Sequence, residues 1–152
     1  MKLFTKMIYW SLIVIALIQF IPVDRINKPV DKKVNFVDVF ATPPAVKSVL
    51  KKACYDCHSN ETIYPKYAYV APFSWSVKNH VNEGREHLNF SEWGNFNKDL
   101  KKGMLENTVH SVRDYSMPLP AYIAQHAEAN LTKEERVLLS NYFENLLNSG
   151  NY

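Results

Sequence analysis

The residues with the clearest chemical meaning in this sequence are two cysteines and a histidine in one short segment, Cys54-Tyr55-Asp56-Cys57-His58. The C-x-x-C-H pattern is typical of covalent attachment of a c-type haem. Thiols three positions apart lie on one turn of backbone, where they reach the two vinyl groups of a porphyrin and form thioethers. The next residue then gives an imidazole nitrogen to iron. We therefore expect Cys54 and Cys57 to attach one haem c and His58 to be the proximal iron ligand.

Two other kinds of site use the same residue types. A redox dithiol of the thioredoxin kind follows a β-strand, whereas the residues before Cys54 predict a helix. A structural zinc site would combine Cys54, Cys57 and His58 with a distant histidine, but adjacent ligands such as Cys57 and His58 fit one tetrahedral ion poorly. Haem attachment is the favoured interpretation, and a structural zinc module is the remaining alternative.

The second axial position of the iron is less evident from the sequence. Met117 precedes Pro118, and Pro120 follows closely. Since the residue before a proline is biased towards extended backbone, this stiff segment can hold a thioether at a fixed height over a haem. We favour Met117 as the distal ligand, with His80 and His126 as alternatives. An open position would instead indicate a five-coordinate haem sensor or a peroxidase-like protein.

Several other side chains are candidates for the haem surroundings. Tyr67, Trp75 and Arg85 carry donors that suit the propionates, because buried carboxylates need hydrogen bonds or countercharge. A backbone carbonyl turned by Pro65 is expected to accept from the second ring nitrogen of His58 and fix the imidazole. The aromatic candidates for the walls are Tyr64, Tyr67, Phe73, Trp75, Phe90, Trp93 and Tyr122.

The elements that position these residues are predicted to be helices. Thr42 is expected to cap a helix that starts with Pro43 and Pro44 and leads into Cys54. The segment 132–135 is a capping box before a broad apolar stripe. Further helices are predicted over 74–87 and 97–113. Because alternating patterns of the strand type are scarce, the domain is expected to be all-α.

The N-terminus differs in composition from the rest of the chain. Lys2 and Lys6 precede an uncharged run of 17 residues, 7–23, which is at the short end of what crosses a bilayer. No small-x-small cleavage site follows, so a membrane anchor is favoured over a cleaved signal peptide. The basic residues just after the run would place the rest of the chain in the cytoplasm, which conflicts with haem c attachment outside it. We expect an anchor or signal at 1–23, a tether at 24–41 and a haem c domain at 42–152.

The charge balance argues against a nucleic-acid partner. The formal net charge is +3, and without residues 1–23 it is +1, from 16 basic and 15 acidic residues. A nucleic-acid-binding protein normally concentrates basic residues in a patch. Membrane anchoring would instead favour a membrane-associated redox partner by raising its local concentration. The oligomeric state is open.

Seven segments together resemble a haem-binding-domain family of membrane-tethered or exported bacterial proteins. They are 54–59, 64–67, 71–75, 80–85, 88–93, 117–122 and 131–136, and the resemblance runs from about residue 49 to residue 147. It implies a variant of the cytochrome c fold, one covalent haem c per chain and electron transfer. An electron carrier or haem-binding protein is favoured over an enzyme. The expected location is the periplasmic side of the inner membrane, or the periplasm if the N-terminus is cleaved.

Overall fold

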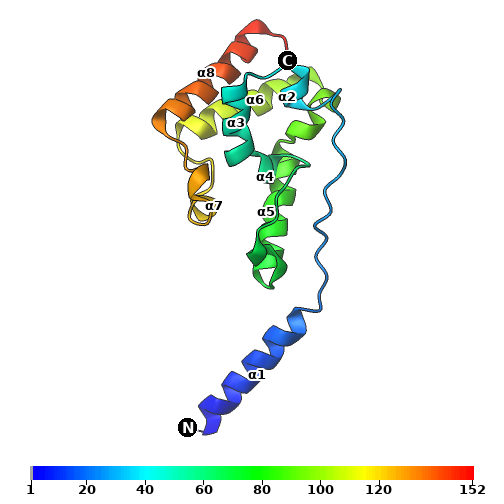
Figure 1. Cartoon of the computed structure of the whole chain (residues 1–152), viewed down its shortest axis with the longest axis vertical. Coiled ribbons are helices and arrows are strands. Elements are labelled where there is room, and N and C mark those ends of the chain that lie inside the picture. Colours follow the sequence, from blue (N-terminus) through cyan, green and yellow to red (C-terminus); the bar gives the residue numbers. More distant parts are fainter. Residues whose placement is uncertain (1) are drawn as a thin grey trace.

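A computed structural model describes residues 2–152, and within them it contains helices but no strand, which confirms the predicted all-α class (Figure 1). The α-helices are α1 (Lys2–Ile18), α2 (Phe36–Val39), α3 (Pro44–Ala53), α4 (Tyr55–His58), α5 (Phe73–His87), α6 (Lys98–Arg113), α7 (Pro120–Ile123) and α8 (Lys133–Ser149). Short 3-10 helices are η1 (Lys66–Tyr69), η2 (Phe90–Asn95) and η3 (Ala127–Ala129).

The helical body is built on the pairing of α6 with α8, and α3 packs against α8. The single turn of α4 follows α3 and contacts α5. In Figure 1, α5 and α7 extend from the same side of the body, and α4 lies at the upper end of α5. This arrangement places the C-x-x-C-H turn at the junction of the body with α5.

The core includes residues that precede position 42. Phe36 in α2 is fully buried, and its ring centroid lies 5.2 Å from that of Phe90 and 5.1 Å from that of Trp93. Gly94 donates its backbone N–H to the Val34 carbonyl at 2.8 Å. The packed unit therefore begins within the segment 24–41 that the sequence suggested as a tether.

Helix ends follow the sequence signals with one correction. The capping box of α8 is confirmed: the Thr132 hydroxyl accepts from the Glu135 N–H at 3.2 Å, and the Glu135 carboxylate accepts from the Thr132 N–H at 3.0 Å. The expected cap at Thr42 is wrong, because Pro43 occupies the N-cap position of α3. Packing of α3 against α8 gives the Thr42 hydroxyl a different partner, the hydroxyl of Tyr142 at 3.1 Å.

Helix α1 lies apart from the body, at the end of an extended segment (Figure 1). Across residues 2–152, none of the helices combines the length and the apolar character that crossing a membrane requires, so the structure does not support the predicted transmembrane helix. The chain just after α1 does contact the domain. The Gln19 side-chain amide donates to the Ala71 carbonyl at 3.1 Å and accepts from the Ala71 N–H at 2.9 Å.

Candidate functional site

The two cysteines and the histidine lie on one backbone turn. The N–H groups of Cys57 and His58 both donate to the Cys54 carbonyl, at 3.2 and 2.9 Å. Both thiols are free. Burial raises the pKa of Cys54 to about 12 and that of Cys57 to about 11. The thiols are therefore neutral, unlike the low-pKa thiolates of redox dithiols.

The imidazole of His58 is fixed by two backbone carbonyls. Its Nδ1 lies 2.8 Å from the Gly84 oxygen and 3.1 Å from the Leu88 oxygen. Because a carbonyl only accepts, Nδ1 carries the proton, and the lone pair of Nε2 is left available for a metal. Burial lowers the pKa of His58, which keeps the ring neutral. The expected carbonyl near Pro65 was wrong, since both acceptors come from the C-terminal end of α5.

Gly84 allows α5 to approach the C-x-x-C-H turn this closely. A Cβ atom at position 84 would lie 2.6 Å from the Cys57 carbonyl oxygen, which is a backbone atom and cannot rotate away. The absence of a side chain therefore brings the Gly84 carbonyl within reach of His58. A lone glycine inside a helical pattern is the sequence signal for such an approach.

The segment around α7 is tied to the same turn from another direction. The Tyr122 hydroxyl donates to the Asp56 carboxylate at 2.7 Å, so this bond reaches a residue between the two cysteines. The Tyr67 hydroxyl lies 2.9 Å from Nε2 of His126, and Nδ1 of His126 lies 3.3 Å from the Glu128 carboxylate. The rings of Tyr122 and His126 stack with centroids 4.4 Å apart. Sequence reasoning did not identify these contacts.

Met117 is half-buried in the segment between α6 and α7. Its backbone N–H donates to the Ser111 carbonyl at 3.0 Å, and its carbonyl accepts from the Arg136 guanidinium at 2.8 Å. Of the alternative iron ligands, His80 is exposed on α5. His126 has hydrogen-bond partners at both ring nitrogens.

The three predicted propionate donors, Tyr67, Trp75 and Arg85, differ in their exposure and in their hydrogen-bond partners. Tyr67 bonds to His126, and Trp75 is 36% exposed on the first turn of α5. Arg85 donates to protein acceptors on residues 59, 62 and 27, at 2.8, 2.9 and 2.8 Å. Two of these bonds connect α5 to the chain that leaves the C-x-x-C-H turn, and the third connects it to the segment 24–41.

The predicted aromatic walls fall into two groups. Phe90 and Trp93 are each 1% exposed and belong to the core around Phe36. Phe73 is exposed, whereas Tyr64 and Tyr122 are half-buried. Packing in the protein core therefore explains the burial of Phe90 and Trp93 without a cofactor.

These residues fit a covalently attached haem. The fit rests on neutral thiols on one turn, an imidazole with only one nitrogen engaged, and a glycine where a side chain would obstruct the turn. Within the described part of the chain, no group of three or more His, Cys, Asp or Glu side chains is arranged to hold a metal ion. The zinc alternative therefore gains no support.

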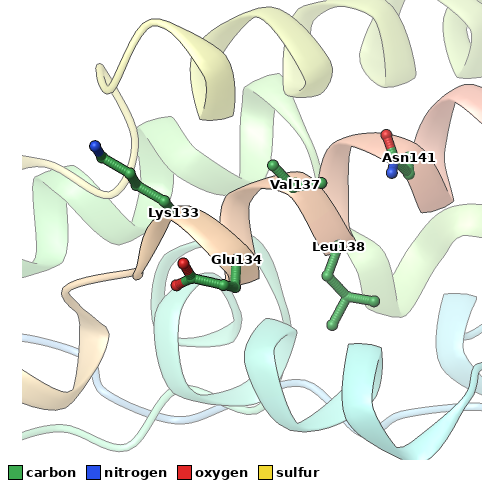
Figure 2. Close-up of a pocket in the computed structure, with 5 residues that line it drawn as sticks. All are labelled: Lys133, Glu134, Val137, Leu138 and Asn141. Atoms are coloured by element: carbon green, nitrogen blue, oxygen red, sulfur yellow. The ribbon is translucent and has the colours of Figure 1, made fainter.

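Two surface hollows lie elsewhere. One is a shallow hollow along α8, lined by Lys133, Glu134, Val137, Leu138 and Asn141 (Figure 2). The other lies between the segment 24–29 and α5 and includes Arg85. Neither is lined by Cys54, Cys57 or His58, so neither is part of the candidate site.

Comparison with known families adds one finding. Residues 13–145 match the family model described as a haem-binding domain. No curated protein and no solved structure matches the chain.

Proposed function

Because this chain belongs to the haem-binding domain family and therefore carries a haem-binding domain, we propose that it is a monohaem, c-type cytochrome-like protein that transfers single electrons. The observation that carries the proposal is the C-x-x-C-H turn, whose histidine has Nδ1 fixed by two carbonyls and Nε2 free for a metal. When bound, haem iron supplies the one-electron chemistry, and the protein supplies attachment, ligation and burial.

Each residue of the turn has a separate role in this proposal. Cys54 and Cys57 hold the haem as thioethers, which requires two free thiols on one turn. The Gly84 and Leu88 carbonyls orient the His58 ring, so its Nε2 occupies the proximal position without searching other rotamers.

We assign the distal position to Met117. Its backbone is held at both the N–H and the carbonyl, which limits the positions that its side chain can reach. His126 would have to break its bond to Tyr67 or Glu128 to bind a metal, and such a rearrangement costs binding energy. A thioether ligand also raises the reduction potential relative to a second histidine, which suits an electron carrier.

The proposal extends to location and partners. Attachment of haem to a C-x-x-C-H motif outside the cytoplasm would place the domain on the periplasmic side of the inner membrane, or free in the periplasm after cleavage within residues 1–23. The expected partner is a redox protein, membrane-associated if the N-terminus is retained.

The test is expression of the full chain in cells that attach haem c, followed by extraction with acidified acetone. We expect the wild-type protein to keep its haem through extraction, because thioether bonds do not dissociate. The Cys54→Ser/Cys57→Ser variant should release any haem that it binds. A wild-type protein that loses its haem on extraction would contradict covalent attachment.

The reduced wild-type protein should also bind carbon monoxide weakly, because Met117 occupies the distal position. Rapid, tight binding would contradict that assignment and favour a five-coordinate sensor or a peroxidase-like protein. The Met117→Ala variant is the matched reference for an open position.

A further inference from the structure

Arg136 is a buried cation in α8, at the end of the segment 131–136 that the electron-transfer proposal leaves unexplained. Its side chain is 5% exposed. One terminal nitrogen, Nη1, donates to both the Val112 and the Met117 carbonyls, at 2.8 Å each. The guanidinium lies over the Tyr115 ring, 4.1 Å from its centroid.

These contacts fix a loop at both of its ends. Val112 lies in the last turn of α6, and Met117 lies three residues before α7. Between them Tyr115 has φ +64°, a left-handed conformation that a non-glycine residue adopts at a cost. A single guanidinium that binds both carbonyls therefore holds together a loop that local backbone preference does not favour.

The cost of burying Arg136 indicates that the contact has a role. A buried charge is strongly unfavourable unless it is hydrogen-bonded, and here backbone oxygens are the acceptors. The side-chain Nε is buried and has no hydrogen-bond partner among the described residues, so the guanidinium is only partly satisfied. A methionine or leucine would fill the same space without that cost.

The neighbouring residue of α8 contacts the opposite side of the site. Glu135 accepts a hydrogen bond from Lys52 at 2.5 Å, and Lys52 lies in the last turn of α3, just before Cys54. Consecutive residues of α8 thus contact the helix that leads into the attachment turn and the loop that carries Met117. Helix α8 sets the position of one relative to the other.

We propose that Arg136 is the positioning residue for the Met117 loop: it binds the Val112 and Met117 carbonyls so that the thioether stays in the distal position. This inference rests on the proposed role of Met117 as the distal ligand. The buried positive charge also disfavours the more positive ferric state, so it raises the reduction potential.

The test uses the haem-loaded full chain and compares Arg136→Met with wild type. The readouts are the charge-transfer band of methionine bound to ferric haem, the affinity of the ferric protein for imidazole and the reduction potential. We expect Arg136→Met to have a weaker charge-transfer band and a lower reduction potential than wild type. We also expect it to bind imidazole at least about tenfold more tightly, because the charged hydrogen bonds that hold the Met117 loop are lost. Arg136→Lys keeps the charge and one of the two bonds, so we expect an intermediate imidazole affinity and a potential near wild type.

Leu139→Ala is the matched control for a merely structural role. Leu139 is fully buried one turn further along α8, and its truncation destabilises the domain without removing a bond to the loop. We expect a lower Tm with an unchanged band and imidazole affinity. If Leu139→Ala changes the band and the imidazole affinity as much as Arg136→Met does, the proposed positioning role of Arg136 is wrong.

Met117→Ala separates the two proposals. If this variant leaves the band unchanged, Met117 is not the distal ligand and the ligation proposal fails. If Met117→Ala abolishes the band while Arg136→Met and Arg136→Lys leave band and affinity at wild-type values, only the role of Arg136 fails. The lysine variant decides the question if Arg136→Met does not yield folded protein.

Discussion

On the proximal side of the proposed site, Cys54, Cys57 and His58 share a single turn whose spacing is set by local backbone bonds. On the distal side, Met117 lies in a loop and is held by Arg136, which follows it by 19 residues and belongs to helix α8. A local turn keeps its geometry as long as the turn exists, whereas a distal loop held by long-range bonds can shift while the fold survives. Proximal changes should therefore affect whether haem is bound, and distal changes should affect how it is ligated.

The most severe test of this difference is Gly84→Ala. The added Cβ would meet the Cys57 backbone, so α5 must move away and the two carbonyls must release His58. We expect a loss of about 3 kcal/mol in unfolding free energy, at the upper end of the usual overpacking cost, and a lower yield of haem-loaded protein. Thermal unfolding and the ratio of haem to protein measure both effects.

Gly103→Ala is the matched control, because a Cβ at position 103 in α6 meets nothing within 4 Å. Alanine is the better helix former, so this variant should gain up to about 1 kcal/mol. Equal behaviour of the two alanine variants would show that close approach to the proximal turn is not required.

A smaller effect is expected from Tyr122→Phe. This change removes the hydrogen bond to Asp56, which connects the α7 segment to the proximal turn. We expect a loss of about 1–2 kcal/mol in unfolding free energy, because the acceptor is a half-buried carboxylate, with haem attachment intact and tighter imidazole binding. Exposed Tyr69→Phe is the control. Loss of haem attachment in Tyr122→Phe would contradict the separation of the two sides.

The smallest expected effect is the contribution of the Lys52–Glu135 contact to the pH dependence of the unfolding free energy. Hydrogen bonds from Lys52 and from the Thr132 N–H hold the pKa of Glu135 below its ordinary value of 4.5. A depressed carboxyl pKa adds stability above the unfolded-state value, and this stability is lost as the pH falls through the folded-state value. Glu135→Gln keeps an acceptor for the cap but not the charge. Wild type should be slightly more stable than this variant at pH 7, and the difference should disappear as the pH falls through the folded-state pKa of Glu135.

Denaturant unfolding of wild type and Glu135→Gln at several pH values measures this difference in stability. Salt at 0.5 M should reduce the difference, because the Lys52–Glu135 pair is partly exposed. A difference that grows as the pH falls would have the wrong sign for this contact.

The helices of the domain could largely be predicted from the sequence. The Thr132 capping box marks a real helix start, because such a cap acts within one turn. The helix predicted over 97–113 is also present, as α6, and the structure adds that the Asn97 side chain caps it. The cap at Thr42 was wrong because a tertiary partner, Tyr142, binds the hydroxyl. Phe36 was a candidate to pack onto the domain, but its partners Phe90 and Trp93 were beyond local signals, since they lie more than fifty residues away.

The sequence by itself determined the residue types of the proposed proximal side, because the C-x-x-C-H spacing is local and each side chain there has a specific reactivity. Only the tertiary structure decided which groups hold His58 and Met117. Their partners are the Gly84 and Leu88 carbonyls in one case and the Arg136 guanidinium in the other. Every residue has a backbone carbonyl, so a carbonyl acceptor has no sequence signature. Which acceptor lies within reach of which donor depends on how the helices pack.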